Sequence, residues 1–314
     1  MALTIGVDIG GTKVAAGVVD ESGQILMLDK RDTPAQDPQA TEDTIAGAVA
    51  DLLVSHPHVS AVGIGAAGFV DAQRSTVLFA PNLAWREEPI KTELRKRIGL
   101  PIAVENDANA AAWAETRFGA ARGHDYVICV TLGTGIGGGI VLDGRLYRGR
   151  WGMAGEFGHM RVVPGGLRCG CGNKGCWEQY ASGKALVREG RELAESGSPL
   201  ADALLDRAGG DAARITGPLI TQAAKNGDPT SIELLEDTGR WLGVGLASLA
   251  AILDPGCIVI GGGVSDAGDL LLGPARDSFH RSLVGRGHRP EAAIKIAELG
   301  PEAGLVGAAD LARA

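Results

Sequence analysis

The alternation of apolar and polar residues at the start of the chain predicts three short strands. An apolar run, Leu3–Val7, ends in Asp8 and is followed by a Gly-Gly turn. Further strands are expected over Val14–Val19 and near Gln24–Lys30, with a polar turn between them. Short polar turns between apolar runs are typical of hairpins, so these strands are expected to form an antiparallel meander.

Through the next hundred residues, helical spacing of apolar residues alternates with short apolar runs. The expected elements are a helix over Thr41–Ser55, a strand over Ser60–Gly65, a helix with Ile90, Leu94 and Ile98 on one face, a strand over Ile102–Val104 and an Ala-rich helix over Ala108–Phe118.

A second set of strands begins near residue 126 and repeats the order of the first. The strand Tyr126–Leu132 leads to a glycine-rich turn with Thr134, then to the strand Gly137–Leu142 and an acidic turn. The opening of the chain has the same sequence of parts. This internal repeat predicts two related α/β halves.

The C-terminal part combines a long helix, Pro229–Leu253, with the strand Cys257–Ile260 and a run of glycines. A final helix over Glu302–Arg313 is expected to pack back on the first half. The segment Gly197–Thr216 has no clear pattern. We therefore expect a smaller N-terminal α/β domain of residues 1–118 plus 301–314, and a larger C-terminal α/β domain of residues 119–300.

Composition narrows the possible functions. Hydrophobic residues make up 45% of the 314, enough for real cores, and the net charge is −8. An acidic chain with no Lys/Arg run longer than Arg95–Arg97 argues against binding to nucleic acid. No apolar run approaches the roughly 20 residues of a membrane span. The N-terminus enters a strand directly and does not resemble a signal peptide, so a cytoplasmic protein is expected.

The stretch 156–180 holds three of the five cysteines. Cys169, Cys171 and Cys176 follow His159 by ten to seventeen residues, and the glycines between them allow tight turns. Three thiolates and one imidazole are the donor set of a closed tetrahedral zinc site. A zinc ion here would fix the direction of Glu156 and Glu178, which flank the cluster.

A disulfide with one spare thiol is the alternative for these cysteines. The remaining two, Cys129 and Cys257, lie in apolar runs and are expected to be buried strand residues. A chain without an even, dense cysteine pattern is typical of a reducing compartment, where clustered cysteines more often bind metal.

Three predicted strands end in glycine turns, at Gly10–Gly11, Gly133–Gly135 and Gly261–Gly263. Glycine permits positive φ and lets backbone N–H groups face an anion, an arrangement that binds phosphate. A simple hairpin turn is the alternative for any one of them. Three such turns in one chain, two of them with a Thr hydroxyl, favour a nucleotide-phosphate site. Asp8 could hold Mg²⁺ there through water.

Two other nucleotide-binding motifs are excluded. The stretch from Gly63 to Gly68 matches G-x-G-x-x-G, but it does not open an amphipathic helix, so a dinucleotide site is disfavoured. No G-x-x-x-x-G-K-[ST] run occurs in the chain, which therefore has no P-loop.

Asn106 and Asp107 lie where a strand ends and a helix begins. Either side chain could be an ordinary helix N-cap. The functional alternative is a general base that takes a proton from a hydroxyl as it attacks phosphorus. The two interpretations are compatible, since a carboxylate at a helix N-terminus stays ionised and well directed.

Together these segments resemble the ROK family (repressors, open reading frames and kinases) of the actin-like, hexokinase-like ATPase superfamily, and most of all its actinobacterial glucokinases. The matching motifs are DIGGTK at Asp8–Lys13, END at Glu105–Asp107, LGTGIGGG at Leu132–Gly139, GEFGH at Gly155–His159, CGCGNKGCWE at Cys169–Glu178 and IGGG at Ile260–Gly263. The resemblance implies a two-lobed α/β fold of the duplicated ribonuclease H-like type, with a central cleft and a structural zinc site.

The resemblance also implies roles for individual residues. Asp107 corresponds to the catalytic base that acts on the sugar 6-hydroxyl. The implied sugar ligands are Gly68, Asn82, Asn106, Asp107, Glu156, His159 and Glu178. The implied nucleotide and Mg²⁺ positions are Asp8, Gly10, Gly11, Thr12, Lys13, Thr134, Gly135, Gly262 and Gly263. The implied zinc ligands are His159, Cys169, Cys171 and Cys176.

The expected activity is ATP-dependent phosphorylation of glucose to glucose 6-phosphate by a homodimer or homotetramer. The alternatives are a kinase for another hexose or an N-acylhexosamine, polyphosphate as the donor, and a non-catalytic sugar sensor. A sugar-responsive repressor would need an N-terminal DNA-binding domain, and here the first strand is expected to begin at Leu3.

Overall fold

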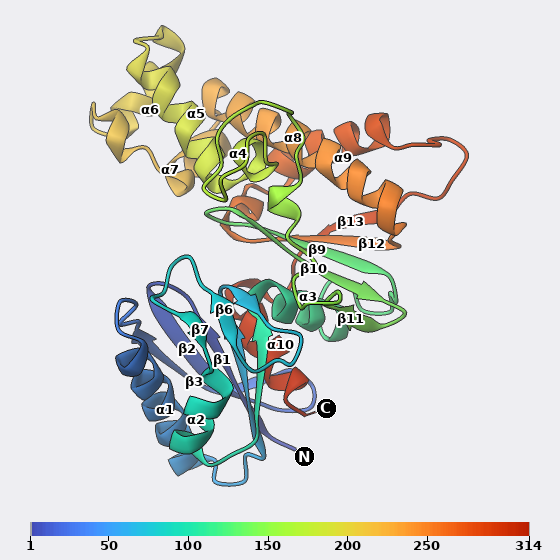
Figure 1. Cartoon of the computed structure of the whole chain (residues 1–314). Helices are drawn as coiled ribbons and strands as arrows, with labels where there is room; N and C mark the ends of the chain where they lie inside the picture. Colours follow the sequence, from blue (N-terminus) through green and yellow to red (C-terminus); the bar gives the residue numbers. More distant parts are fainter. Residues whose placement is uncertain (1, 314) are drawn as a thin grey trace. The chain divides into compact units, whose positions relative to one another are not determined.

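The computed structural model describes residues 2–313 (Figure 1). The chain divides into two compact units. The first consists of Met1–Cys129, Gly139–Gly155 and Ala297–Ala314, and the second of Val130–Gly138 and Glu156–Ile296.

A five-stranded sheet forms the centre of the first unit. Its strands are β1 (Thr4–Ile9), β2 (Lys13–Val19), β3 (Ile25–Asp32), β4 (Ala61–Ala66) and β8 (Ile102–Asn106), in the order β3-β2-β1-β4-β8. β1 and β2 pair antiparallel, as do β2 and β3, so the predicted meander is confirmed. β4 and β8 add in parallel, which brings the C-terminal ends of β1, β4 and β8 to one edge of the sheet.

Helices complete the first unit. α1 (Pro38–Ser55) and α2 (Ile90–Ile98) pack against each other, and α3 (Asp107–Arg117) packs against α10 (Ala303–Leu311). α1 begins three residues before the predicted Thr41, because the Asp37 side chain accepts a hydrogen bond from the Ala40 N–H and Pro38 occupies the first turn.

A small antiparallel sheet of β5 (Phe69–Val70), β6 (Val77–Phe79) and β7 (Arg86–Glu88) was not expected from the sequence. Strands of two or three residues are too short to show the alternation that identifies a strand. This small sheet belongs to the first unit and connects β4 to α2.

The C-terminal helix α10 lies directly on the backbone of the first unit. A Cβ at Gly6 would be 1.9 Å from the Leu305 carbonyl oxygen, and one at Gly63 would be 1.8 Å from that of Ala308. Gly63 is therefore needed for close packing of a helix on a strand. The dinucleotide-like motif that begins at Gly63 has this structural explanation and opens no helix.

A second five-stranded sheet has the order β11-β10-β9-β12-β13. Its strands are β9 (Val127–Leu132), β10 (Ile136–Leu142), β11 (Arg145–Tyr147), β12 (Cys257–Gly261) and β13 (Ala293–Ile296). In chain order this is the same 3-2-1-4-5 arrangement as in the first sheet. The predicted repeat of two related α/β halves is thus confirmed at the level of topology.

The second unit is rich in helices. They are α4 (Glu178–Ala181), α5 (Gly183–Glu195), α6 (Asp202–Arg207), α7 (Gly217–Lys225), α8 (Pro229–Leu253) and α9 (Asp269–Ser282). α8 has the predicted bounds, and its N-terminus is capped by the Asp228 side chain. The segment without a clear pattern, 197–216, contains α6 between the 3₁₀ turns η2 (Pro199–Ala201) and η3 (Ala212–Arg214).

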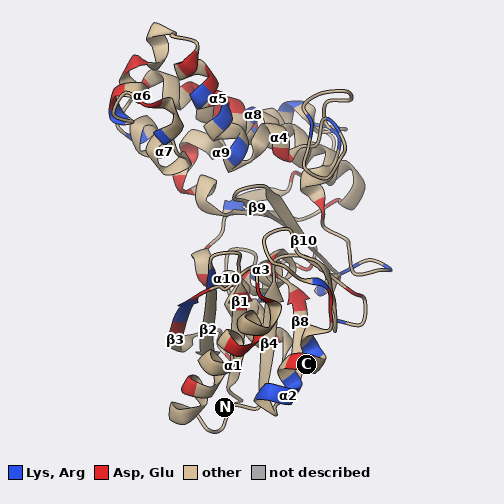
Figure 2. Ribbon diagram, turned by 60° about the vertical axis from the view of Figure 1, so that its left-hand side comes forward, with Lys and Arg blue, Asp and Glu red and all other residues tan. Residues whose placement is uncertain are grey.

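Charged residues of both signs are interspersed over the helices of each unit (Figure 2). α2, for example, carries Arg95, Lys96 and Arg97 in its last turn and Glu93 in its first. Within residues 2–313, no helix combines the length and the apolar character that a membrane crossing requires.

Candidate active site

The predicted site residues are divided between the two units. Asp8, the Gly10–Lys13 turn, Gly68, Asn82, Asn106 and Asp107 belong to the first unit. Thr134, Gly135, Glu156, His159, the three clustered cysteines, Glu178, Gly262 and Gly263 belong to the second.

In the first unit, the junction of β8 and α3 directs the Asp107 side chain. The helix cap is Asn106, whose Oδ1 accepts a hydrogen bond from the Asn109 N–H at 3.0 Å. The Asn106 Nδ2 donates to Asp107 Oδ1 at 3.0 Å and to the Gly68 carbonyl oxygen at 3.1 Å. Asn106 therefore performs the capping, which leaves the Asp107 carboxylate available for chemistry.

Burial changes the protonation of both strand-end carboxylates. Burial raises the pKa of Asp107 to about 6, although hydrogen bonds from the backbone and from Asn106 favour the ionised form. Burial, with a smaller effect from the negative charge of Asp107, raises the pKa of Asp8 to about 7. A divalent cation beside Asp8 would offset both the burial of this carboxylate and the repulsion from Asp107, and so favour its ionised form. Carboxylates are the ligands that Mg²⁺ prefers.

The Gly10–Lys13 turn is a tight hairpin between β1 and β2. The Gly10 N–H donates to the Lys13 carbonyl oxygen at 2.9 Å, and the Thr12 and Lys13 side chains are exposed. A Cβ on Gly11 would lie 2.8 Å from the Asn82 Cβ, so glycine is needed here for the approach of Asn82.

The expectation that positive φ explains the glycine turns is wrong at most positions. Gly262 has φ +84°, but Gly10, Gly11, Gly133 and Gly135 do not have positive φ. At Gly11 and Gly135, glycine is needed instead because a neighbouring residue approaches closely. At Gly135, a Cβ would lie 2.5 Å from Glu178 Oε2.

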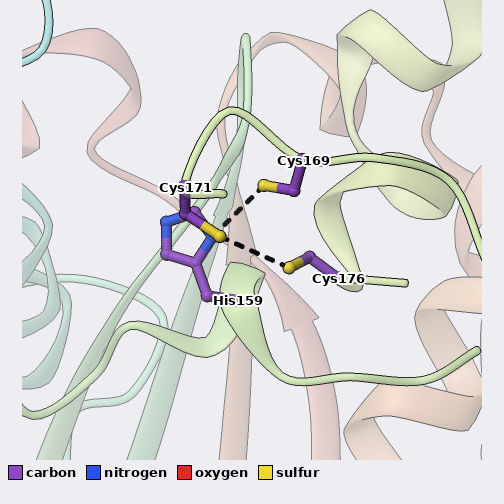
Figure 3. A group of neighbouring side chains, drawn as sticks. All are labelled: His159, Cys169, Cys171 and Cys176. Atoms are coloured by element: carbon purple, nitrogen blue, oxygen red, sulfur yellow. Dashed lines mark hydrogen bonds between the residues drawn. The ribbon is translucent and has the colours of Figure 1, made fainter. Parts of the chain in front are cut away.

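In the second unit, His159, Cys169, Cys171 and Cys176 converge, with their ligand atoms within 4.8 Å of one another (Figure 3). Cys171 Sγ lies 3.6 Å from Cys176 Sγ, and Cys169 Sγ lies 3.7 Å from His159 Nδ1. A tetrahedron with bonds of about 2.3 Å to sulfur and about 2.0 Å to nitrogen has edges of about 3.5 to 3.8 Å. The cluster therefore has the chemistry and the spacing of a zinc site.

The segment that carries the cysteines has little regular structure. It contains the 3₁₀ turn η1 (Phe157–His159) and isolated bridges. Gly175 has φ +79°, and a Cβ there would lie 1.7 Å from the Val163 carbonyl oxygen. Burial raises the pKa of the Cys169 thiol to about 12, so a bound metal is needed to hold this sulfur as a thiolate.

Glu178 lies beside the cysteine cluster. The Cys169 thiol donates to Glu178 Oε1 at 3.0 Å, and this oxygen is 3.9 Å from His159 Nδ1. Glu156 is exposed and immediately precedes η1, and its carbonyl oxygen accepts from the His159 N–H at 3.2 Å. The cluster thus contacts the Glu178 carboxylate directly, and it is linked to Glu156 through the backbone.

A cavity of about 1020 Å³ lies within the second unit. It brings Thr134 and Gly263 together with residues of α5 and α7, and a volume of this size can hold a nucleotide. The lining residues that the sequence did not indicate include Lys184, Arg188, Thr221, Gln222, Lys225 and Asp266. Lys184 and Arg188 lie on α5, and Thr221, Gln222 and Lys225 lie on α7, two helices without a recognisable motif. Asp266 lies on the 3₁₀ turn η4 (Gly263–Ala267), directly after the third glycine turn. Only the fold brings these residues together at the cavity.

The fold and these side chains define an α/β protein with a duplicated five-stranded sheet, strand-end carboxylates and a Cys₃His cluster. Residues 4–314 match the ROK family, and the chain belongs to it. The predicted fold class is confirmed by this match and by the similar structures below.

The chain is 56% identical to a glucokinase of Streptomyces coelicolor over 313 residues, which cover 100% of this chain and 98% of that protein. A glucokinase of Thermotoga maritima is 37% identical, with 98% and 96% covered. The crystal structure of a ROK family glucokinase from Streptomyces griseus in complex with glucose and AMPPNP has a TM-score of 0.90 and 57% identity, with 99% of both chains covered.

Proposed function

We propose that the protein is a glucokinase that transfers the γ-phosphoryl group of ATP to the 6-hydroxyl of glucose. One observation carries the proposal: Asp107 is a half-buried carboxylate, directed by Asn106, and burial raises its pKa to about 6. A general base needs such a position and such a pKa. The similarity to a glucokinase solved with glucose and AMPPNP supports the same substrates.

In the proposed mechanism, Asp107 accepts the proton of the sugar 6-hydroxyl. The hydroxyl oxygen forms a bond to the γ-phosphorus as the bond from phosphorus to the β–γ bridging oxygen breaks. ADP leaves with the bonding electrons. Positioning and electrostatic stabilisation account for most of the catalysis in phosphoryl transfer. Mg²⁺, which Asp8 would hold through water, neutralises charge on the phosphates when it is bound.

The proposed sugar ligands are Gly68, Asn82, Asn106, Asp107, Glu156, His159 and Glu178. His159 directs Nδ1 toward the cysteines, so Nε2 is available for a sugar hydroxyl. The zinc ion would orient His159 directly. Glu178 Oε1 lies 3.9 Å from His159 Nδ1, so the position of Glu178 depends on the folded cluster.

The proposed nucleotide ligands are Gly10, Gly11, Thr12 and Lys13 in the first unit, and Thr134, Gly135, Gly262 and Gly263 in the second. The cavity beside Thr134 and Gly263 offers room for the nucleoside.

A coupled assay over a panel of sugars, with ATP and polyphosphate in parallel, tests the proposal. The expected result is the highest kcat/KM with glucose and ATP. A preference for another hexose or an N-acylhexosamine would keep the enzyme class but change the substrate, because sugar choice depends on a few hydrogen bonds. Absence of phosphorylation with every sugar would overturn the proposal and favour a sugar sensor.

Three further expectations belong to this proposal. The protein is expected to assemble as a homodimer or homotetramer, which light scattering can measure. A reducing, cytoplasmic location is supported by the five cysteines, none of which forms a disulfide within residues 2–313. The domain limits of 118/119 and 300/301 stay a prediction that limited proteolysis can test.

A further inference from the structure

Glu105 is a buried charge in the first unit to which the proposed mechanism gives no role. It stands at the end of β8, directly before Asn106, and its side chain is 4% exposed. Its two carboxylate oxygens contact different groups. Oε1 accepts hydrogen bonds from neutral amides, and Oε2 faces two guanidinium groups.

The Oε1 atom fixes the start of α3. It accepts from the Asn106 N–H and from Asn109 Nδ2, both at 3.1 Å. Asn109 is also bonded through its own N–H to the Asn106 side chain. Since Asn106 donates to Asp107 Oδ1, any shift of this junction would change the direction of the Asp107 carboxylate.

The Oε2 atom lies 2.6 Å from Arg148 Nε and 3.6 Å from Arg74 Nε. Two cations thus face one carboxylate. Arg74 has φ +57°, and its Nη2 is buried without a partner among residues 2–313. Burial lowers the pKa of Arg74, the charge of Glu105 opposes this effect, and the charge of Arg148 adds to it. Two partly buried guanidinium groups around one buried carboxylate, with an unpaired buried donor, are costly for stability, which favours a functional reason for the cluster.

Arg148 connects this cluster to the segment that leads to Glu156. The Arg148 carbonyl oxygen accepts from the Ala154 N–H at 3.1 Å. Gly152 has φ +85°, and a Cβ there would lie 2.4 Å from the Val70 carbonyl oxygen, so the segment packs tightly on β5. Arg148 is therefore bonded both to the residue that orients Asn106 and to the turn that precedes Glu156.

We infer that Glu105, held by Arg148 and Arg74, is a positioning residue for the sugar site: it sets the directions of Asn106 and Asp107 and ties the 148–155 segment to them. This inference rests on the proposed function. Glu105 itself touches no substrate in this scheme and acts through the β8–α3 junction.

Arg148→Gln tests the inference, because it removes one of two cations and leaves Glu105 paired with Arg74. We expect glucose affinity, measured by calorimetry without ATP, to weaken about tenfold, and kcat to fall about tenfold, as for a small displacement of reacting groups. The KM for ATP is expected to change by less than about twofold. Arg148→Lys keeps the charge and is expected to recover part of both losses.

A pH profile adds a readout that a purely structural role would not change. The hydrogen bond from Asn106 lowers the pKa of Asp107. If Arg148→Gln loosens the junction, the acid limb of kcat/KM should move to higher pH.

Arg97→Gln is the matched control. Arg97 Nη2 lies 2.9 Å from Glu42 Oε2, and the Arg97 and Glu42 side chains are 25% and 3% exposed, against 26% and 4% for Arg148 and Glu105. Arg97→Gln should lower Tm and leave glucose affinity and kcat unchanged.

The inference is overturned if Arg148→Gln keeps wild-type glucose affinity, kcat and acid limb, or if Arg97→Gln reduces glucose affinity and kcat by the same factors. Failure of the proposed function is a separate result. If the wild type binds glucose without phosphorylating it, the kinase proposal fails, while weaker glucose binding by Arg148→Gln still supports the positioning role.

Discussion

In the first unit, the candidate carboxylates Asp8 and Asp107 stand at the ends of buried strands, whereas in the second unit His159 and Glu178 border a segment with little regular structure. Asp107 is fixed by the β8–α3 junction and its hydrogen bonds. The segment between His159 and Glu178 has glycine turns and isolated bridges, and its four metal-binding side chains converge on one point.

This difference shows that a sheet and a metal cluster can each fix the direction of a side chain in a binding site. Where a core surrounds a site, hydrogen bonds at strand ends are enough to direct a carboxylate. Where the chain has little regular structure, the free energy of metal binding can supply the order. Disruption of the metal site should therefore affect the second set of residues and spare the first.

The largest expected effect is that of Asp107→Asn, which removes the base and keeps its shape. We predict a fall in kcat of roughly 10²–10⁴ with nearly unchanged glucose affinity. Steady-state kinetics and calorimetry measure the two quantities. Turnover like that of the wild type in this variant would remove Asp107 from the role of base.

Loss of the zinc site should weaken glucose binding. Elemental analysis is expected to find one zinc per chain, and Cys171→Ala should weaken glucose binding by about 10- to 100-fold, since Glu178 loses its fixed surroundings. Cys257→Ala is the control, because Cys257 is buried in β12 outside the cluster. Metal-free protein with full activity would contradict the comparison between the units.

The pH dependence of kcat/KM tests the role of Asp107 in the first unit, without any contribution from the metal cluster. The base must be ionised, and the pKa of Asp107 is about 6, so kcat/KM should fall about tenfold per pH unit below that value. Circular dichroism at the same pH values would show that the protein stays folded. A kcat/KM that stays constant to pH 4.5 would exclude a base with this pKa.

A smaller effect is expected from Gly135→Ala in the second unit. The new Cβ would lie 2.5 Å from Glu178 Oε2 and would displace this flexible carboxylate, so glucose affinity should fall several-fold. At Gly133, a Cβ would meet no described atom within 4 Å. Gly133→Ala should therefore preserve glucose affinity measured without ATP. Equal losses in both variants would show that the turn itself, and not Glu178, is responsible.

The smallest expected effect is that of Asp8→Asn on the free energy of unfolding. The pKa of Asp8 in the folded protein is about 7, above its value of 3.8 in the unfolded chain, so ionisation of Asp8 destabilises the fold increasingly from about pH 4 to about pH 7. In Mg²⁺-free buffer, Asp8→Asn should raise the free energy of unfolding by roughly 1–2 kcal/mol at pH 8. The gain in Tm should be smaller at pH 5, and an equal gain at both pH values would refute the electrostatic cause.

Much of the fold could be predicted from the sequence. The meander, the limits of α8 and the repeated order of strands all follow from local periodicity and from turn residues. The three strands between Phe69 and Glu88 could not be predicted, because they are too short for a pattern. The reason for the glycine turns was also missed, since close contacts with Asn82 and Glu178 depend on residues distant in the sequence.

The sequence by itself determined which donors are available: three clustered cysteines, one histidine, and the Asn106–Asp107 pair after a strand. Local spacing is sufficient for such conclusions because these groups are close in the chain. Only the tertiary structure decided which residues surround them. It brings Arg74 and Arg148 to Glu105, places α10 on β1 and β4, and forms the cavity of the second unit from α5, α7 and two glycine turns. These contacts join residues far apart in sequence, and side-chain packing specifies them.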